Sequence, residues 1–124
     1  MVRRASDLIA SYVGETEQNL AKTFRGAQHD GAILLIDEAD SFLHDREAAR
    51  HSWEVTAVNE MLTQMELFSG LLICTTNRLG HLDPASLRRF AFKIKFDYLT
   101  PEQCWQLFQA QAGPLPSGNE SAYR

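Results

Sequence analysis

Four segments of the chain have the spacing of apolar residues that is typical of regular elements. Apolar residues recur every three or four positions from Glu15 to Gln28 and again from Trp53 to Phe68, which predicts two helices. Ala32–Ile36 and Leu71–Thr76 are short and almost continuously apolar, a pattern typical of parallel strands covered on both faces. The order strand, helix, strand predicts a right-handed crossover and a parallel sheet.

Two further elements are predicted towards the C-terminus. Phe92–Phe96 alternates apolar and basic residues, which is typical of a strand at a sheet edge with one face in water. A last helix is expected after Thr100, because this residue is a good N-cap, Pro101 suits the first helical position, and Gln103 can complete a capping box. Residues 113–124 are rich in Gly, Pro and Ser, so we expect an unstructured tail there.

The composition is that of one soluble globular domain. With 124 residues, 44% of them hydrophobic and 23% charged, the chain is too short for two domains, and we expect one, over residues 1–112. No apolar run approaches the roughly 20 residues that cross a bilayer, so no membrane partner is expected. The formal charge of −4 argues against a nucleic-acid partner. The cysteines, Cys74 and Cys104, are too few for a disulfide framework, which favours a reducing, cytoplasmic location.

A pair of acidic residues follows the first apolar run directly. Asp37 and Glu38 are expected at the carboxyl end of that strand, which is where open parallel sheets bind their ligands. Asp37 can hold a nucleotide-bound Mg²⁺, and Glu38 can orient and deprotonate an attacking water. The alternative is that Asp37 only caps the following helix, but capping does not account for Glu38 or Asp40.

The next predicted strand also ends in polar residues. Residues 37–40 read Asp-Glu-Ala-Asp, so a DEAD-box RNA helicase has to be weighed; that family places a Ser-Ala-Thr element on a later strand. Here the later strand ends in Thr75, Thr76 and Asn77 instead. Asn77 can reach the same water or a terminal phosphate, or it can bond the local backbone.

Four motifs, in order and at consistent spacing, resemble those of the AAA group of AAA+ ATPases. Ile33–Asp40 resembles Walker B, Thr75–Asn77 resembles sensor 1, and Leu82–Phe90 resembles the arginine-finger segment. Ser11–Glu17 resembles the first pore loop, in which an aromatic residue, an apolar residue and Gly lead into a helix. The resemblance extends from about Ser6 to Gln111.

This resemblance implies ATP and Mg²⁺ as cofactors and a role for each residue at the two strand ends. Asp37 would bind Mg²⁺ and Glu38 would be the catalytic base. Asn77 would sense the γ-phosphate of ATP.

The resemblance also implies partners, namely copies of the same protein in a hexameric ring and a protein substrate. Arg88 or Arg89 would enter the ATP site of a neighbouring subunit and offset charge there. Tyr12, Val13 and Gly14 would face a central pore, where the first two grip a polypeptide. The alternatives are a solvated helix end for the arginines and a surface aromatic for Tyr12.

Three departures from the family pattern shape the expected fold. The sequence contains no phosphate-binding G-x-x-x-x-G-K-[ST] motif, known as Walker A, no Pro-Gly-Arg follows Phe90, and no helical lid follows Gln111. We therefore expect an α/β fold, a partial three-layer parallel-sheet P-loop NTPase core that lacks the Walker A strand and the lid. In the family's sheet that missing strand lies between the strand ending at Thr76 and Phe92–Phe96, so Phe92–Phe96 is expected to lack its neighbour.

The functional expectation is a fragment of an AAA-type ATPase, whose intact parent protein couples ATP hydrolysis to protein remodelling or unfolding. Two alternatives stay open. One is an interaction fragment that binds no ATP, because the phosphate-binding loop is missing. The other is an AAA+ motor directed at nucleic acid, which the acidic charge and the pore-loop motif disfavour.

Overall fold

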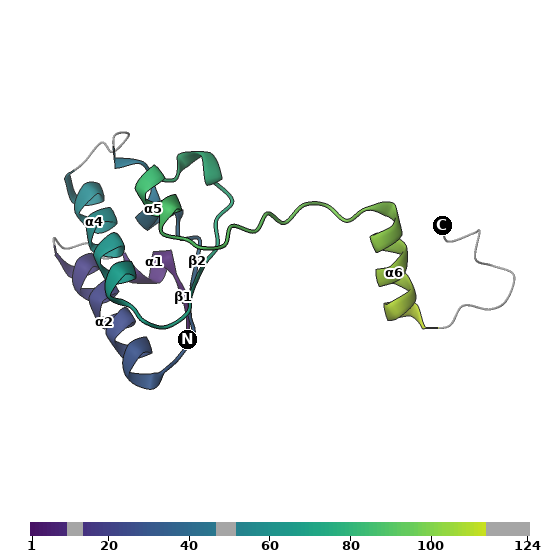
Figure 1. Cartoon of the computed structure of the whole chain (residues 1–124), viewed down its shortest axis with the longest axis horizontal. Helices are drawn as coiled ribbons and strands as arrows, with labels where there is room; N and C mark the ends of the chain where they lie inside the picture. Colours follow the sequence, from purple (N-terminus) through teal and green to yellow (C-terminus); the bar gives the residue numbers. More distant parts are fainter. Residues whose placement is uncertain (10–13, 47–51, 114–124) are drawn as a thin grey trace, which may run out of the picture. The chain divides into compact units, whose positions relative to one another are not determined.

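The computed structural model describes residues 1–9, 14–46 and 52–113. The chain divides into two compact units, Met1–Ala91 and Phe92–Arg124. The first unit holds a sheet and most of the helices, and the second holds helix α6 (Pro101–Ala112) (Figure 1). The predicted tail after Gly113 lies outside the described residues.

The sheet of the first unit has three parallel strands in the order β1-β2-β3. Strand β2 (Leu34–Asp37) lies between β1 (Val2–Arg4) and β3 (Leu72–Cys74). In the register, Leu35 of β2 is opposite both Val2 and Ile73. The two apolar runs thus form neighbouring parallel strands, as the crossover rule predicts.

Strand β1 was not among the predicted elements. Its pairing with the β2 segment begins at Met1, whose ammonium group donates a hydrogen bond to the Ile33 carbonyl at 2.8 Å. The Leu35 amide in turn donates to the Met1 carbonyl at 2.9 Å. A three-residue strand carries no periodicity, but a helix that precedes a buried parallel strand implies an earlier strand, and this signal could have found it.

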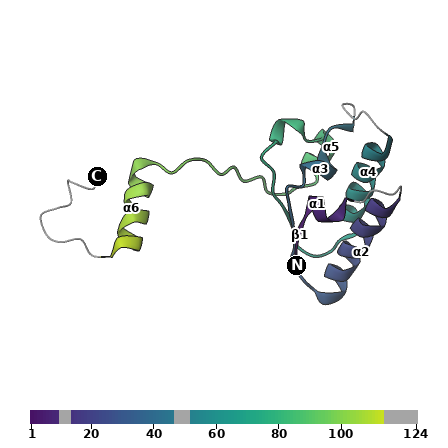
Figure 2. The ribbon, with the colours of Figure 1, turned by 180° about the vertical axis from the view of Figure 1, so that it is seen from behind.

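The predicted helices from Glu15 and from Trp53 are confirmed to within two residues at each end as α2 (Glu15–Asp30) and α4 (Ser52–Leu67). They run side by side against the sheet (Figures 1 and 2). The remaining short helical elements of this unit are α1 (Ala5–Leu8), α3 (Asp40–Leu43), the 3₁₀ turn η2 (Leu79–His81) and α5 (Pro84–Arg88). Within the described part of the chain, no helix combines the length and apolar character that a membrane span requires.

The core lies between these helices and one face of the sheet. Leu34 and Ile36 of β2 are fully buried, together with Phe24 of α2 and Met61 of α4. Phe24 also meets the ring of Phe68 edge to face, with 5.5 Å between ring centroids. The burial of Met61 confirms that the apolar spacing of the second predicted helix reflects core packing.

The other face of the sheet is exposed within the Met1–Ala91 unit. Val2 and Ile73, which share a face with Leu35 through the register, are 64% and 41% exposed. The continuous apolar pattern of the strands predicted cover on both faces, and this unit supplies it on one. An apolar surface is therefore left open on the unit.

The prediction of a strand over Phe92–Phe96 is wrong. Residues 92–100 adopt neither helix nor strand, and Phe92, Ile94 and Phe96 are 85%, 77% and 92% exposed. A strand is stable only when a neighbour takes up its backbone hydrogen bonds. None of the three strands of the sheet takes that place, which agrees with the expectation that this segment lacks its neighbour.

The predicted last helix is confirmed as α6. The Gln103 amide donates to the Thr100 hydroxyl at 3.3 Å, and the Thr100 amide donates to Gln103 Oε1 at 2.9 Å. This is the reciprocal capping box that the local sequence indicates.

Candidate active site at the carboxyl edge of the sheet

The acidic pair lies at the carboxyl end of the central strand, beside the end of β3. Asp37 is the last residue of β2, and its carboxylate accepts a hydrogen bond from the Thr75 hydroxyl. The same hydroxyl oxygen accepts from the Glu38 amide at 3.1 Å, and the Thr75 carbonyl accepts from the Ala39 amide at 2.9 Å. One threonine therefore ties together the two strand ends on which the acids sit.

A second hydroxyl extends this polar edge. Thr76 donates to Asp40 Oδ1 at 3.2 Å and accepts from the Arg78 amide at 3.0 Å. Asn77 lies between Thr76 and Arg78 in the loop and is exposed. Sequence reasoning placed Asp37, Glu38 and Asn77 at one edge, and the structure brings their strand ends together there; it adds Thr75 and Thr76 as the residues that link them.

The oxygen-rich edge is chemically suited to a nucleotide-bound Mg²⁺. Such an ion is held by one or two carboxylates together with waters and substrate phosphates, rather than by a cage of protein ligands. Among the described residues, no three His, Cys, Asp or Glu side chains converge on one point. The carboxyl end of β2, with the half-buried Asp37 carboxylate, fits a site in which waters and phosphates complete the coordination of Mg²⁺.

Glu38 has an unusual backbone conformation. Its φ of 57° is positive, and it is the single non-glycine residue of the described segments for which this holds. A left-handed conformation is disfavoured for residues with a Cβ, and it persists where the surroundings hold it. Here the hydrogen bonds from the Glu38 and Ala39 amides to Thr75 hold the turn between β2 and α3.

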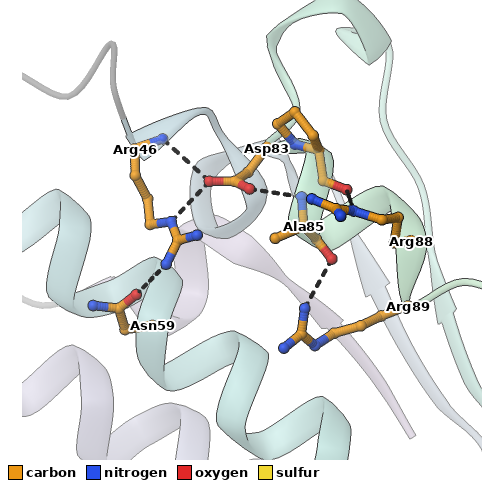
Figure 3. Close-up of polar contacts among 7 residues, drawn as sticks. Arg46, Asn59, Asp83, Ala85, Arg88 and Arg89 are labelled. Carbon is orange, nitrogen blue, oxygen red and sulfur yellow. Dashed lines mark hydrogen bonds and ion pairs between the residues drawn. The ribbon is translucent and has the colours of Figure 1, made fainter.

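The two candidate finger arginines differ in their contacts (Figure 3). Arg88, the last residue of α5, bonds through Nε to the Pro84 carbonyl of its own helix at 3.3 Å. Arg89 donates to the Ala85 carbonyl at 2.9 Å and also forms an ion pair with Glu66 of α4. Arg89 is thus held by contacts within its own chain, and Arg88 has no ion pair within the described residues.

The start of α5 is fixed by the buried residue Asp83, which sequence reasoning did not single out. Its carboxylate accepts from the Ala85 amide and from Arg46 Nε, each at 2.8 Å. Burial by itself would raise the pKa of Asp83, but the hydrogen bonds from Ala85 and Arg46 and the nearby guanidinium charge lower that pKa below its usual value of 3.8. The Asp-Pro pair is a recognisable N-cap signal, whereas nothing in the sequence links Asp83 to Arg46.

Of the predicted pore-loop residues Tyr12, Val13 and Gly14, the structure describes Gly14 alone. Gly14 has a φ of 82° at the N-cap of α2, a conformation that glycine adopts without steric cost. Tyr12 and Val13 lie outside the described residues. None of the described contacts joins Arg88 or Arg89 to the acid pair.

The parallel α/β sheet and its acidic strand end define a partial core of the P-loop NTPase class. Residues 1–98 match the ATPase family associated with various cellular activities, known as AAA, and the chain belongs to this family.

Individual relatives agree with this membership. CdcH of Halobacterium salinarum is 33% identical over an alignment of 102 residues, which covers 78% of this chain and 14% of CdcH. Spastin of Drosophila melanogaster is 32% identical over 124 residues, covering 90% of this chain and 16% of spastin. This chain therefore spans about a seventh of the length of these two relatives.

A solved structure supports the fold as well. One chain of the Escherichia coli MS115-1 HORMA:CdnC:Trip13 complex superposes with a TM-score of 0.80 at 26% sequence identity. The match covers 98% of this chain and 46% of that chain. Together with the family match, this similarity confirms the AAA+ resemblance and the α/β fold class that the motifs indicated.

Proposed function

We propose that this chain is part of an AAA-type ATPase that couples ATP hydrolysis to the remodelling of a protein. The observation that carries the proposal is the pair Asp37 and Glu38 at the end of β2, tied through Thr75 to the end of the neighbouring strand. Family membership supports it, because AAA proteins are ATPases by description.

Within this proposal each residue of the sheet edge has a separate role in ATP hydrolysis. ATP with its Mg²⁺ supplies the transferable phosphoryl group, and the metal neutralises part of the phosphate charge. Asp37 holds the metal, and Glu38 orients a water and accepts its proton as the water attacks. Asn77 offers an amide that can donate to that water or to the γ-phosphate.

The contacts of the arginines favour Arg88 as the finger. A finger must leave its own subunit and stabilise charge in a neighbour's site. Arg89 would first have to break its ion pair with Glu66, whereas Arg88 has only a bond to its own helix to give up. We therefore assign the trans role to Arg88 and an intrasubunit role to Arg89.

The proposal places the reaction in a longer protein. The 124 residues contain no phosphate-binding G-x-x-x-x-G-K-[ST] loop, so hydrolysis needs such a loop from outside this sequence. In that longer protein we propose a hexameric ring in the cytoplasm, with Tyr12 and Val13 gripping a protein substrate. The same missing loop favours the alternative of a non-catalytic interaction fragment, which binds no nucleotide in any assembly.

Replacing Glu38 tests the proposal. In the full-length ATPase that carries this chain, Glu38→Gln should leave ATP binding intact and lower hydrolysis at least about 100-fold, because an amide cannot accept the proton of the water. Glu60→Gln on α4 is the matched control and should leave turnover unchanged. Hydrolysis above about a tenth of the wild-type rate would remove Glu38 as the base.

Mixing variants tests the trans role of Arg88. Arg88→Ala subunits should bind nucleotide but turn over slowly, and mixing them with Glu38→Gln subunits should restore part of the activity. At some mixed interfaces one subunit supplies the base and the other supplies the arginine. Arg89→Ala should have the smaller effect on turnover. If neither arginine affects hydrolysis, the assignment of this segment as a finger is wrong.

A further inference from the structure

Segments 43–46 and 81–85 lie side by side, although they are far apart in the sequence. An antiparallel bridge joins His44 to Leu82, and backbone hydrogen bonds of 2.7 and 2.8 Å flank it. We call these two segments the junction. The junction connects the end of α3, the helix that follows the acid pair, to the start of α5, the helix that carries Arg88.

One carboxylate holds the junction together (Figure 3). Asp83 Oδ1 accepts from the Ala85 amide at 2.8 Å, and Oδ2 accepts from Arg46 Nε at 2.8 Å and from the Arg46 amide at 3.4 Å. The Arg46 guanidinium also donates through Nη1 to Asn59 Oδ1 on α4, at 2.9 Å. Asp83 and Arg46 therefore connect the junction to α4 as well as to α5.

Because Asp83 is buried, its hydrogen-bond donors have to occupy defined positions around its carboxylate. Only 6% of the Asp83 side chain is exposed, against 38% of the Arg46 side chain. A buried ion pair adds little net stability, because desolvation offsets the attraction, but a buried carboxylate that loses its partners is strongly unfavourable. The start of α5 is consequently confined to the one position in which Asp83 keeps its donors.

Helix α5 is also held at its other end. It has five residues, and just beyond them Arg89 pairs with Glu66 of α4. A helix this short, attached at both ends, has little freedom to turn. The direction from which Arg88 leaves the helix is then set by the junction on one side and by Glu66 on the other.

We propose that Asp83 and Arg46 are positioning residues, which fix α5 and its Arg88 relative to the acid pair of the same subunit. The proposal rests on the proposed function, because it assumes that Arg88 contributes to hydrolysis at a neighbouring site. Neither residue touches the reacting atoms. Both act through the placement of Arg88.

A double-mutant comparison of turnover tests this role in the full-length ATPase. Asp83→Asn should lower kcat about tenfold or more, since small misplacements of a catalytic group are costly, and should leave KM for Mg-ATP within about twofold. In an Arg88→Ala background the same change should lower kcat less than about twofold, because no finger is left to misplace. An equal fold-loss in both backgrounds, or no loss in the wild type, would overturn the proposal.

A gentler variant covers the case in which Asp83→Asn fails to fold. Arg46→Lys keeps the charge but loses the planar fork that reaches Asp83 and Asn59 together. It should lower kcat severalfold in the wild type and leave the Arg88→Ala background unchanged. The control is Asp97→Asn, which breaks the exposed pair with Lys95 and should leave kcat as it was. Equal losses in the two backgrounds would overturn the proposal here too.

The outcomes separate this inference from the proposed function. If Glu38→Gln hydrolyses ATP normally, the proposed function itself fails. If Glu38→Gln is inactive while Arg88→Ala is fully active, the proposed function stands and the positioning role is overturned, since Arg88 then has nothing to contribute. If Glu38→Gln is inactive, Arg88→Ala turns over slowly but measurably, and the Asp83→Asn effect on kcat disappears in the Arg88→Ala background, the inference is supported.

Discussion

At the scale of single residues, Glu38 combines a candidate catalytic carboxylate with a left-handed backbone. A non-glycine residue in this conformation costs on the order of 1–3 kcal/mol. The backbone strain at Glu38 therefore opposes folding, while the hydrogen bonds of Thr75 hold the turn in place. Strain of this kind is common where function, rather than stability, determines the residue.

Glycine at position 38 should relieve that strain. We expect Glu38→Gly to leave the free energy of unfolding unchanged or to raise it by up to about 1 kcal/mol, because glycine adopts a positive φ freely. The matched change Glu60→Gly, in the interior of α4, should lower it by about 1 kcal/mol. Denaturant unfolding of the 124-residue chain, at concentrations below the onset of self-association, measures both, and similar losses at the two positions would show that Glu38 is unstrained.

The two cysteines should differ in reactivity. Burial raises the pKa of the Cys74 thiol to about 12, and the thiolate is the form that reacts with alkylating agents, whereas Cys104 is exposed. At pH 8 the folded chain should therefore lose the Cys104 thiol quickly and the half-buried Cys74 thiol much more slowly. Mass spectrometry with Cys104→Ser as the control identifies the protected thiol. Labelling of Cys74 in the folded chain as fast as that of Cys104 would contradict the raised pKa of its thiol.

The limits of sequence reasoning at this scale lie in contacts between distant residues. Asp37 and Glu38 were predictable, because they directly follow an apolar run that has to be a strand. Asp83 lies 37 positions from Arg46, and Arg46 lies 13 positions from Asn59. Apolar periodicity describes neighbours along one element, so it carries no information about polar partners on different elements.

At the scale of elements, the contribution of Asp83 to the stability of the α5 N-terminus depends on pH. Its pKa is lowered in the folded chain, so the folded state binds its proton less readily than the unfolded state. The stability that the ionised carboxylate contributes is therefore fully present above its usual pKa of 3.8 and is lost as the pH falls through the lower, folded value.

Asp83→Asn should reveal this contribution directly. Above about pH 5 the variant should be less stable than the wild type by roughly 1.5–3 kcal/mol, the range for hydrogen bonds to a charged group. Below pH 3.8 the difference should shrink, which urea unfolding at a series of pH values would show. In an Arg46→Ala background the pH dependence of the difference should weaken. A difference that stays constant into strong acid would contradict the ionised contact.

The elements also show which local signals suffice by themselves. Helix α6 was predictable, because its capping box lies within four consecutive residues, Thr100 to Gln103. Phe92–Phe96 alternates apolar and polar residues as a strand does, but it does not form one. Alternation shows which side chains share a face, and it does not show whether a second strand is available for pairing. Strand β1 shows the converse, because pairing with β2 defines it despite a pattern too short to recognise.

At the scale of the whole molecule, both units expose large apolar side chains. Val2 and Ile73 are exposed on the sheet of the first unit, and Phe92 and Phe96 are almost fully exposed in the second. Exposed apolar patches and free strand edges favour association. The fold class was predictable from motif order, and the exposure of Phe92 and Phe96 agrees with the predicted loss of their neighbour strand. The open face of the sheet was not predicted, because the strand pattern indicated cover on both faces.

The 124-residue chain by itself should accordingly self-associate or be only marginally stable. We expect sedimentation velocity to show species larger than a monomer as the concentration rises, or thermal unfolding to be broad. Titration calorimetry should find weak binding of Mg-ATP or none, since the sequence has no phosphate-binding loop. A monodisperse, cooperatively unfolding monomer that binds ATP at micromolar concentration would contradict both expectations.

The strand order β1-β2-β3 also has a consequence for synthesis on the ribosome. The spatial order equals the order in the chain, so each strand can join the edge left by the previous one as it emerges. Among these three strands, none has to be inserted between two that are already paired. Within the part of the sheet that this chain supplies, the segment from Met1 to Asp37 can therefore close its crossover before β3 has been translated.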